Sequence, residues 1–318
     1  MTTKQHREIY NKNLLHPWGD LSELGNDESS SVIVKGKGIH IFDSDGNKMI
    51  DGPAGMWCMQ TGYGRKEIAD AVSKQILSLS YATSFTLIND KETELAKRIS
   101  EQTPGDLNRI YFTTGGSTAV DSALRLCQLA NNIKGARNKK QIITREKAYH
   151  GSTYLSASVT GKERDKTAMD VKREGIHFLK APCHFYYPEF DNEDDFCDFL
   201  INELEEKIIE IGPENIMAFI AEPILASGGV IVPPKNYNYR CWEVVKRYNI
   251  IYIADEVVTA FGRLGYWFAS EHVFGIIPDI IIFAKGITSG YIPMGGYAVS
   301  EKFMSTFSGD EADGCLYS

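Results

Sequence analysis

Closely spaced cysteine pairs are missing from this chain of 318 residues. Its six cysteines are scattered, and none has the Cys-x-x-Cys spacing of a zinc ribbon or a redox site. This spacing argues against a disulfide-dependent secreted domain and against a structural zinc site. We therefore expect no metal, and a reducing compartment suits six free thiols.

Long apolar runs and an excess of positive charge are also absent. No apolar stretch approaches the roughly 20 residues that cross a bilayer, and the polar N-terminal residues lack the apolar core of a secretory signal. Acidic residues outnumber basic ones by 42 to 34, which gives a net charge of −8. A nucleic-acid-binding protein normally shows a basic face. We expect a cytoplasmic protein whose partners are neither membranes nor nucleic acids.

Strand and helix patterns alternate through most of the chain. Short runs rich in isoleucine, valine and phenylalanine predict strands at Arg109–Thr113, Gln141–Arg145, Met217–Ala221, Ile250–Ala254 and Asp279–Ala284. Helical periodicity predicts helices at Ser117–Ala130, Asp194–Ile211 and Tyr239–Arg247. This alternation is typical of an α/β domain with a mostly parallel central sheet covered on both faces. The irregular stretch 162–193 is expected to cross the surface.

The N-terminal part has a different pattern. Gly38–Asp51 predicts a β-hairpin, because its Asp-Gly dipeptide supplies the positive φ of a tight turn. Arg65–Leu79 and Glu92–Ile99 have the apolar spacing of helices.

Three predicted strands end in an ionisable residue: Glu222 in FIAEP, Asp255 in IIYIADEV and Lys285 in IIIFAKG. Ligands of open α/β sheets bind outside the carboxyl ends of the strands, so these side chains are expected to converge. A single charged residue at a strand end more often only marks where solvent begins. Together the three indicate a ligand that needs both an amine and an anion.

Two loops at the same sheet edge add candidate ligands. In Thr113–Ser117 the glycines precede a predicted helix, whose first N–H groups could bind a phosphate. An ordinary turn capped by Ser117 explains this loop equally well. Tyr149, before His150 and Gly151, offers a ring on which a flat cofactor could stack, although a tyrosine there is more often part of the core.

At this point the sequence resembles the class III aminotransferases, a family of fold-type I pyridoxal-phosphate enzymes. The resemblance runs from DGNKMIDGPAGMWCMQTGYG through FTTGGSTAVDSALR and AYHGSTYLSASVTG to IIYIADEVVTAFGRLG and IIIFAKGITSGYIPMGG. It implies that pyridoxal 5'-phosphate is bound covalently by Lys285 as a Schiff base, and that Asp255 contacts the pyridine nitrogen. It also implies that Lys285 carries the proton during the reaction.

The resemblance assigns the remaining site residues as well. Gly116 and Ser117 look like phosphate ligands, while Val257 and Tyr149 look like the two sides of the ring pocket, beside His150. Glu222 resembles the glutamate that orders the contacts beneath the cofactor. The family's amine:pyruvate members place aromatic walls around the substrate, which here correspond to Trp57, Phe85 and Tyr149, with Ser227 nearby.

The resemblance also implies an organisation and an activity. Residues 1–58 would belong to a small domain and residues 59–318 to the large cofactor-binding domain, in a homodimer with the active site at the interface. The phosphate loop departs from the usual SGSEA, and the family's C-terminal small domain would follow Ser318, so it is expected to be absent here. The expected reaction transfers an amino group from an ω-amino acid or amine to a keto acid, with pyruvate as the expected acceptor. An aminomutase or decarboxylase of the same fold, or a truncated and catalytically impaired protein, remains an alternative.

Overall fold

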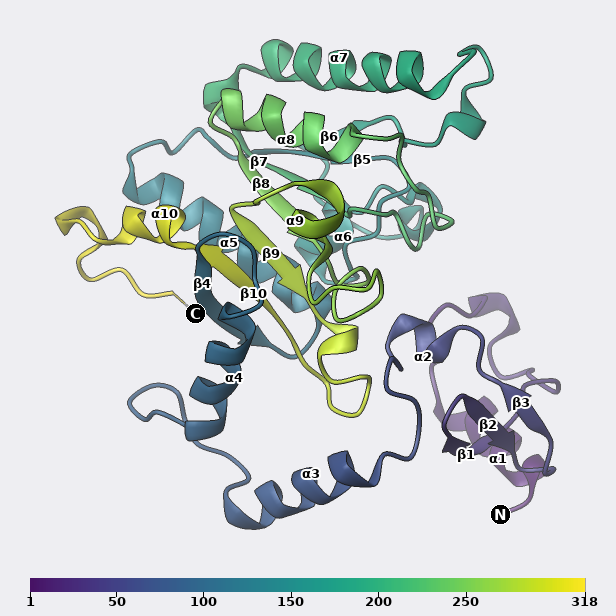
Figure 1. The fold of residues 1–318 in the computed structure, drawn as a ribbon. Helices are drawn as coiled ribbons and strands as arrows, with labels where there is room; N and C mark the ends of the chain where they lie inside the picture. The colour runs from purple at the N-terminus through teal and green to yellow at the C-terminus, as the bar shows by residue number, and fades with distance from the viewer. Residues whose placement is uncertain (318) are drawn as a thin grey trace. The chain divides into compact units, whose positions relative to one another are not determined.

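The structure is a computed structural model, and it describes residues 1–317. The chain forms two compact units, Met1–Tyr81 and Ala82–Ser318, which are described separately (Figure 1). The domain boundary predicted after residue 58 falls inside the first unit and stays a prediction.

The N-terminal unit is built around a small antiparallel sheet. Its strands β1 (Ile33–Lys37), β2 (His40–Asp43) and β3 (Lys48–Ile50) pair in chain order, so the predicted hairpin is confirmed as β2 and β3. Helices α1 (Thr3–Asn13), α2 (Ala54–Trp57) and α3 (Lys66–Ser78) complete the unit, and α3 matches the helix predicted at Arg65–Leu79.

The second unit contains a seven-stranded sheet in the order β4-β10-β9-β8-β7-β5-β6. The strands are β4 (Leu107–Thr113), β5 (Gln141–Arg145), β6 (Ile176–Leu179), β7 (Ile216–Ala221), β8 (Ile251–Asp255), β9 (Ile280–Phe283) and β10 (Gly295–Ser300). All neighbours from β9 to β6 are parallel, whereas β10 is antiparallel to both β4 and β9. The predicted α/β class with a mostly parallel sheet is confirmed.

Two of these strands, β6 and β10, were not predicted from the sequence. The prediction that 162–193 crosses the surface is wrong for β6, which pairs with β5 at the sheet edge. β10 begins with two glycines, which argue against a strand on propensity alone. The fold needs them because a Cβ at Gly295 would lie 2.6 Å from the carbonyl carbon of Gly115.

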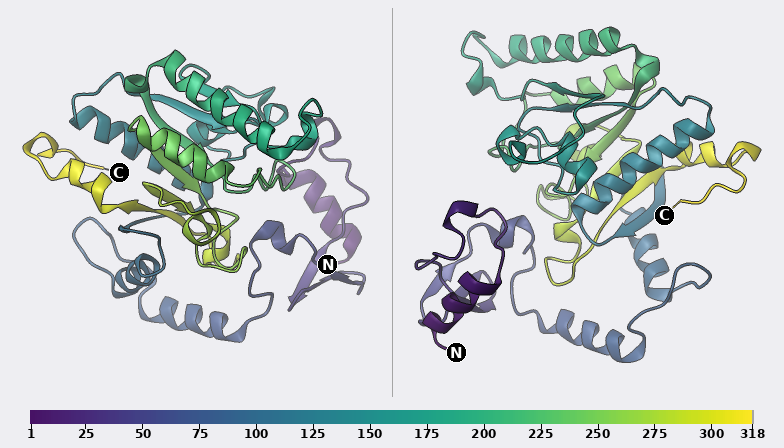
Figure 2. Two further views of the ribbon diagram at one scale, coloured as in Figure 1. Left: turned by 45° about the horizontal axis from the view of Figure 1, so that its top comes forward. Right: turned by 180° about the vertical axis from the view of Figure 1, so that it is seen from behind.

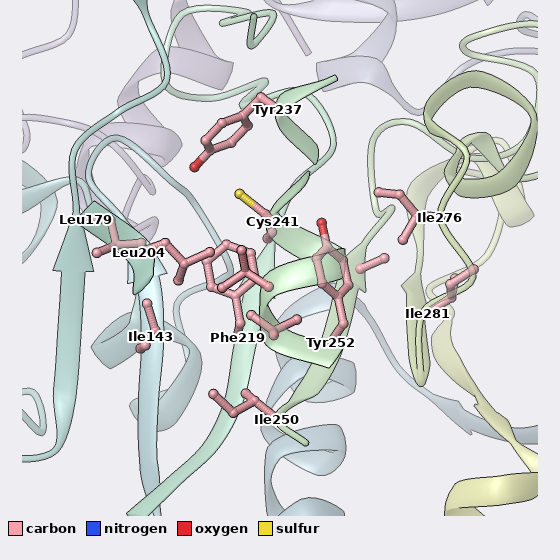
Figure 3. Close-up of a cluster of buried hydrophobic side chains, with 14 of the residues drawn as sticks. Ile143, Leu179, Leu204, Phe219, Tyr237, Cys241, Ile250, Tyr252, Ile276 and Ile281 are labelled. Carbon is pink, nitrogen blue, oxygen red and sulfur yellow. The ribbon is translucent and has the colours of Figure 1, made fainter. Parts of the chain in front are cut away.

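Helices cover both faces of this sheet (Figures 1 and 2). On one face, α7 (Glu193–Ile211) and α8 (Tyr237–Arg247) share a buried cluster with Phe219 and Phe283 (Figure 3). On the other, α5 (Gly116–Ile133), α6 (Tyr154–Val159) and α10 (Glu301–Met304) share a cluster with Ile220 and Ile282. Neighbouring strand residues point to opposite faces, so one apolar strand supplies both clusters.

The second unit also contains the α-helices α4 (Asp90–Ser100), which matches the helix predicted at Glu92–Ile99, and α9 (Ala269–Phe274). In the described part of the chain, no helix combines the length and apolar character needed to cross a membrane.

Candidate active site

The structure brings the three ionisable strand ends to one edge of the sheet. Ala221 of β7 lies opposite Ala254 of β8, and Asp255 lies opposite Ile282 of β9. Glu222, Asp255 and Lys285 therefore follow neighbouring parallel strands at their carboxyl ends. Lys285 has a φ of 46°, a left-handed conformation that is uncommon for a residue with a Cβ. Such backbone strain persists where the surrounding structure enforces it, and often at functional sites.

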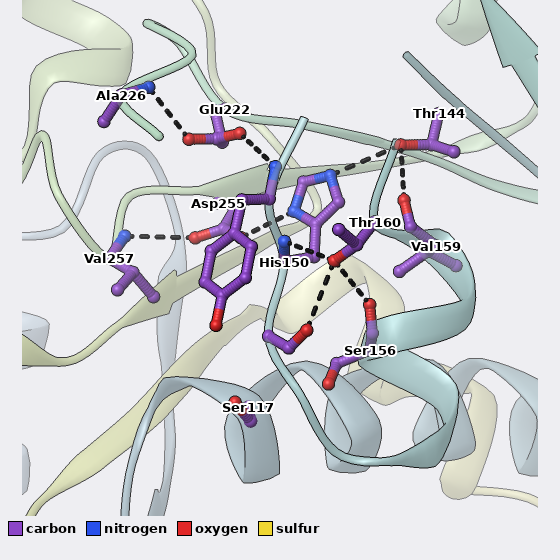
Figure 4. Close-up of polar contacts among 12 residues, drawn as sticks. Ser117, Thr144, His150, Ser156, Val159, Thr160, Glu222, Ala226, Asp255 and Val257 are labelled. Atoms are coloured by element: carbon purple, nitrogen blue, oxygen red, sulfur yellow. Dashed lines mark hydrogen bonds and ion pairs between the residues drawn. The ribbon is translucent and has the colours of Figure 1, made fainter. Parts of the chain in front are cut away.

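Asp255 forms a buried pair with His150. The Nδ1 atom of His150 lies 2.7 Å from Oδ2 of Asp255, and both residues are 3% exposed (Figure 4). The other carboxylate oxygen of Asp255 accepts a hydrogen bond of 3.1 Å from the N–H of Val257. Nε2 of His150 lies 3.3 Å from the hydroxyl of Thr144. The Asp255 carboxylate is thus held in a fixed direction from two sides.

Glu222 is buried beside this pair, and both of its oxygens accept backbone hydrogen bonds. Oε1 accepts from the N–H of Tyr149 at 2.8 Å, and Oε2 accepts from the N–H of Ala226 at 3.1 Å (Figure 4). Burial raises the pKa of Glu222 to about 7, although His150 lowers it, and the Asp255 carboxylate raises it further. Glu222 therefore connects two loops through hydrogen bonds, and with a pKa of about 7 its carboxyl is partly ionised near neutral pH.

Glu256, the acidic residue after Asp255, contacts the start of a helix instead of the candidate site. Glu256 is fully buried and accepts hydrogen bonds from the N–H groups of Ala269 and Ser270 at 2.7 and 2.8 Å. Carboxylates are favourable at a helix N-terminus, and these two residues begin α9. Asp255 thus faces the candidate site, whereas its neighbour Glu256 holds the segment that follows β8 against the start of α9.

The glycine-rich loop lies against the same strand ends. A Cβ added to Gly116 would lie 3.2 Å from Cγ2 of Val257 and 3.6 Å from Cβ of Ala284, so glycine permits this close approach. The N-cap of α5 is Gly115, which has no side chain to cap the helix, so the alternative of a turn capped by Ser117 is wrong. The Ser117 hydroxyl instead accepts from the N–H of Ser152 at 3.0 Å.

Tyr149 is half-buried beside Lys162, a residue that the sequence did not single out. The ammonium of Lys162 lies 5.5 Å from the centre of the Tyr149 ring and donates to the Ser227 hydroxyl at 3.1 Å. The same ammonium pairs with Asp165 at 2.9 Å. Lys162 follows the AYHGSTYLSASVTG block directly, but a lysine in an irregular segment carries no pattern that predicts this contact.

Trp57 and Phe85, two of the three predicted aromatic walls, lie in different units. Trp57 ends α2, which is a single left-handed turn with φ values of 50°, 58°, 67° and 64° from Ala54 to Trp57. Consecutive left-handed residues are costly, so this turn is a strained feature of the N-terminal unit. Phe85 belongs to the second unit and is 95% exposed. Their predicted role around a substrate stays a prediction.

Among residues 1–317, no group of three or more His, Cys, Asp or Glu side chains is arranged to hold a metal ion. The residues present do fit pyridoxal phosphate. The buried Asp255 carboxylate suits a protonated ring nitrogen, and a Cβ at Gly116 would fill the space at the start of α5. That helix start suits a phosphate, because its first N–H groups have no partner within the helix.

The chain belongs to the class-III aminotransferases, since the model of that family matches residues 22–316. Members of this family depend on pyridoxal phosphate.

Individual relatives agree with this classification. The chain is 39% identical to the putrescine–pyruvate aminotransferase of Pseudomonas aeruginosa, over 99% of this chain and 70% of that protein. It is 38% identical to the diaminobutyrate–2-oxoglutarate transaminase of Halomonas elongata, over 87% of this chain and 60% of that protein. Several curated relatives are thus matched over less than two thirds of their length.

Two solved structures of similar fold are ω-transaminases. A thermostable (S)-enantioselective ω-transaminase from Thermomicrobium roseum superposes with a TM-score of 0.95 at 35% identity, over 100% of this chain and 71% of that one. The ω-transaminase of Pseudomonas jessenii, in complex with PMP, has a TM-score of 0.92 at 33% identity, over 96% and 67% of the two chains.

Proposed function

We propose that this chain carries the cofactor site of an aminotransferase that moves an amino group from an ω-amino acid or amine donor to a keto acid, with pyruvate as acceptor. The observation that carries the proposal is the convergence of Glu222, Asp255 and Lys285 at the ends of three neighbouring strands. The family and the named relatives, one of which is a putrescine–pyruvate aminotransferase, support the reaction class.

Pyridoxal phosphate, when bound, supplies an electron sink that makes removal of a proton from the donor carbon feasible. In the proposed site, the Asp255 carboxylate keeps the proton on the ring nitrogen, because an adjacent anion favours the cationic form. The side chain of Lys285, as the neutral amine, would hold the cofactor covalently, and its Nζ would serve as the base that takes the donor proton and as the acid that gives it back.

The other proposed residues bind and orient. Gly116 and Ser117 hold the phosphate through backbone N–H groups and the serine hydroxyl, while Val257 and Tyr149 confine the ring between them. His150 fixes Asp255, with which it is paired at 2.7 Å. Trp57, Phe85, Tyr149 and Ser227 are proposed to form the substrate wall, which favours donors whose amine is remote from a carboxylate.

The organisation proposed for the whole protein follows the family resemblance. We propose that residues 1–58 belong to a small domain and residues 59–318 to the cofactor-binding domain. A cytoplasmic homodimer with the site at its interface completes the proposal, and six cysteines without a disulfide support a reducing compartment.

The experiment that tests the proposed function follows the absorbance of the purified chain with pyridoxal phosphate, before and after adding an amine donor. We expect a band from the covalently held cofactor that disappears with the donor and returns with pyruvate. Borohydride reduction followed by peptide mapping should label Lys285. A label on another lysine would contradict the site. Turnover of an amine without consumption of a keto acid would favour the aminomutase or decarboxylase alternative.

A further inference from the structure

Arg145 is a fully buried charged residue at the end of β5. Residues along β5 alternate between the faces of the sheet, and Ile143 packs in the cluster shared with α7 and α8. Thr144 faces His150 on the other side. Arg145 accordingly lies on the α8 face, where its guanidinium carbon is 5.9 Å from the centre of the Tyr237 ring.

The guanidinium has few partners for a group so deeply buried. Nη2 donates to the backbone carbonyl of Glu222, whereas Nε and Nη1 have no hydrogen-bond partner among the described residues. The positive charge of Arg145 acts on the hydroxyls of Tyr237 and Tyr252 and on the thiol of Cys241, three side chains that Figure 3 shows in this cluster. Burial raises the pKa of Cys241 to about 12, so this thiol is protonated and supplies no negative charge to the guanidinium. Burying a charged group with so few hydrogen-bond partners costs free energy, so the presence of Arg145 here needs an explanation.

The Glu222 carboxylate, which responds to the charge of Arg145, lies at the candidate site. Glu222 follows β7, the neighbour of β5 in the sheet, and the positive charge of Arg145 lowers the pKa of its carboxyl, against the larger effect of burial. Glu222 also faces His150, which favours its charge, and Asp255, which opposes it. Both oxygens of Glu222 accept N–H groups, which suits the ionised form because that form is purely an acceptor.

We propose that Arg145 is a positioning residue, a buried cation that joins the ends of β5 and β7 and favours the ionised form of Glu222. Through Glu222 it fixes the backbone at Tyr149 and Ala226. This inference deepens the proposed function, because Glu222 belongs to the site proposed for the cofactor. Its test needs no cofactor, so the two can fail separately.

The test measures urea unfolding of the complete chain from about pH 5 to about pH 8, with and without pyridoxal phosphate. In the parent, the stability that Glu222 contributes is fully present at low pH and is lost as the pH rises through about 7. In Arg145→Gln, which keeps N–H donors without the charge, the midpoint of this loss of stability should shift to higher pH, because the charge that favours ionisation of Glu222 is gone. Relative to the parent, the variant should be equally or more stable near pH 5 and less stable near pH 8.

Three further variants separate charge from structure. Arg145→Lys keeps the charge, so its stability should be lost with rising pH at the same midpoint pH as in the parent. In a Glu222→Gln background, Arg145→Gln should change stability equally at both ends of the range, because the titrating group is gone. Arg240→Gln removes a guanidinium of α8 that pairs with Asp198 instead, so its effect should not depend on pH.

A loss of stability in Arg145→Gln that is the same at every pH would overturn the proposal and leave a purely structural role. An upward shift of the midpoint in Arg145→Lys equal to that in Arg145→Gln would also overturn it. If Arg145→Gln does not fold, Arg145→Met replaces it under the same two criteria, and failure of both to fold at pH 5 contradicts a role that depends on the charge of Glu222.

Discussion

The two units of the chain are stabilised in different ways. Within residues 1–81, all of which are described, Asp43 is the only buried residue, and its carboxylate accepts hydrogen bonds from Asp45 and Asn47 in the hairpin turn. The second unit has a close-packed apolar core on each face of its sheet. The proposed cofactor residues lie in the unit with the cores, whereas Trp57 lies on a strained turn of the other. Placement of reacting groups to within fractions of an ångström needs the rigidity that such cores provide.

The strongest test of this comparison is Lys285→Ala. It should reduce amine transfer by roughly 10³-fold or more, because the proposed mechanism needs this amine to hold the cofactor and to move the proton. The urea unfolding curve should change little, since the surrounding core is untouched. An amine-transfer assay on the purified variant measures this loss of activity. Substantial remaining turnover would show that Lys285 has no essential role in the proposed mechanism.

A second test compares the cores directly. Phe219→Ala removes a fully buried ring of β7 and should lower the free energy of unfolding by about 3–5 kcal/mol. Ile50→Ala removes a side chain of the N-terminal unit that is 69% exposed, and should change it by no more than about 0.5 kcal/mol. Equilibrium unfolding in urea measures both, and similar effects of the two would break the contrast between the units.

A third test uses pH. The pKa of Glu222 is raised from 4.5 to about 7, so its contribution to stability is fully present below about pH 4.5 and is lost as the pH rises through about 7. The loss should reach about 3 kcal/mol, at 1.36 kcal/mol for each unit of pKa. Glu222→Gln should abolish this pH dependence, and an unchanged profile in the variant would assign the dependence to another group.

A smaller effect is expected at the proposed substrate wall. Trp57→Ala and Phe85→Ala should each shift the preference between bulky and small amine donors by roughly tenfold, because removing a ring enlarges an apolar pocket. The ratio of kcat/KM for two donors is the measurement, with thermal melts in parallel. A loss of stability without a change in that ratio would show that the ring serves packing alone.

The smallest effect is expected in the hairpin. Asp43→Ala removes the acceptor for two backbone N–H groups of the turn, so amide exchange at Asp45 and Asn47 should accelerate by roughly fivefold. Exchange in β7 and β8 should not change, because their protection comes from the cores. Equal acceleration in both units would mean that they unfold together.

Much of this architecture was predictable because its signals are local. The strands β8 and β9, which lead to Asp255 and Lys285, are short apolar runs between helical patterns. All predicted strands and helices were found, with boundary differences of a few residues. The antiparallel strand β10 was missed because its two glycines read as a turn. Only the sheet reveals why glycine is needed there, since the start of α5 passes too close for a side chain.

Within the candidate site, the sequence nominated Asp255, Glu222, His150 and Lys285, through strand ends and a family resemblance. The sequence did not show which of these side chains are in contact. The pairing of His150 with Asp255 joins residues 105 positions apart, and the contact of Lys162 with Tyr149 depends on the path of an irregular loop.

By itself, then, the sequence determined the class of the fold and the identity of its candidate catalytic residues, because periodicity and strand ends are written in neighbouring residues. The tertiary structure alone decided the order of the strands, the burial of Arg145 and the carboxylate contacts of Glu222 and Asp255. These depend on contacts between segments distant in the chain, and burial among such segments sets the charge and direction of each side chain.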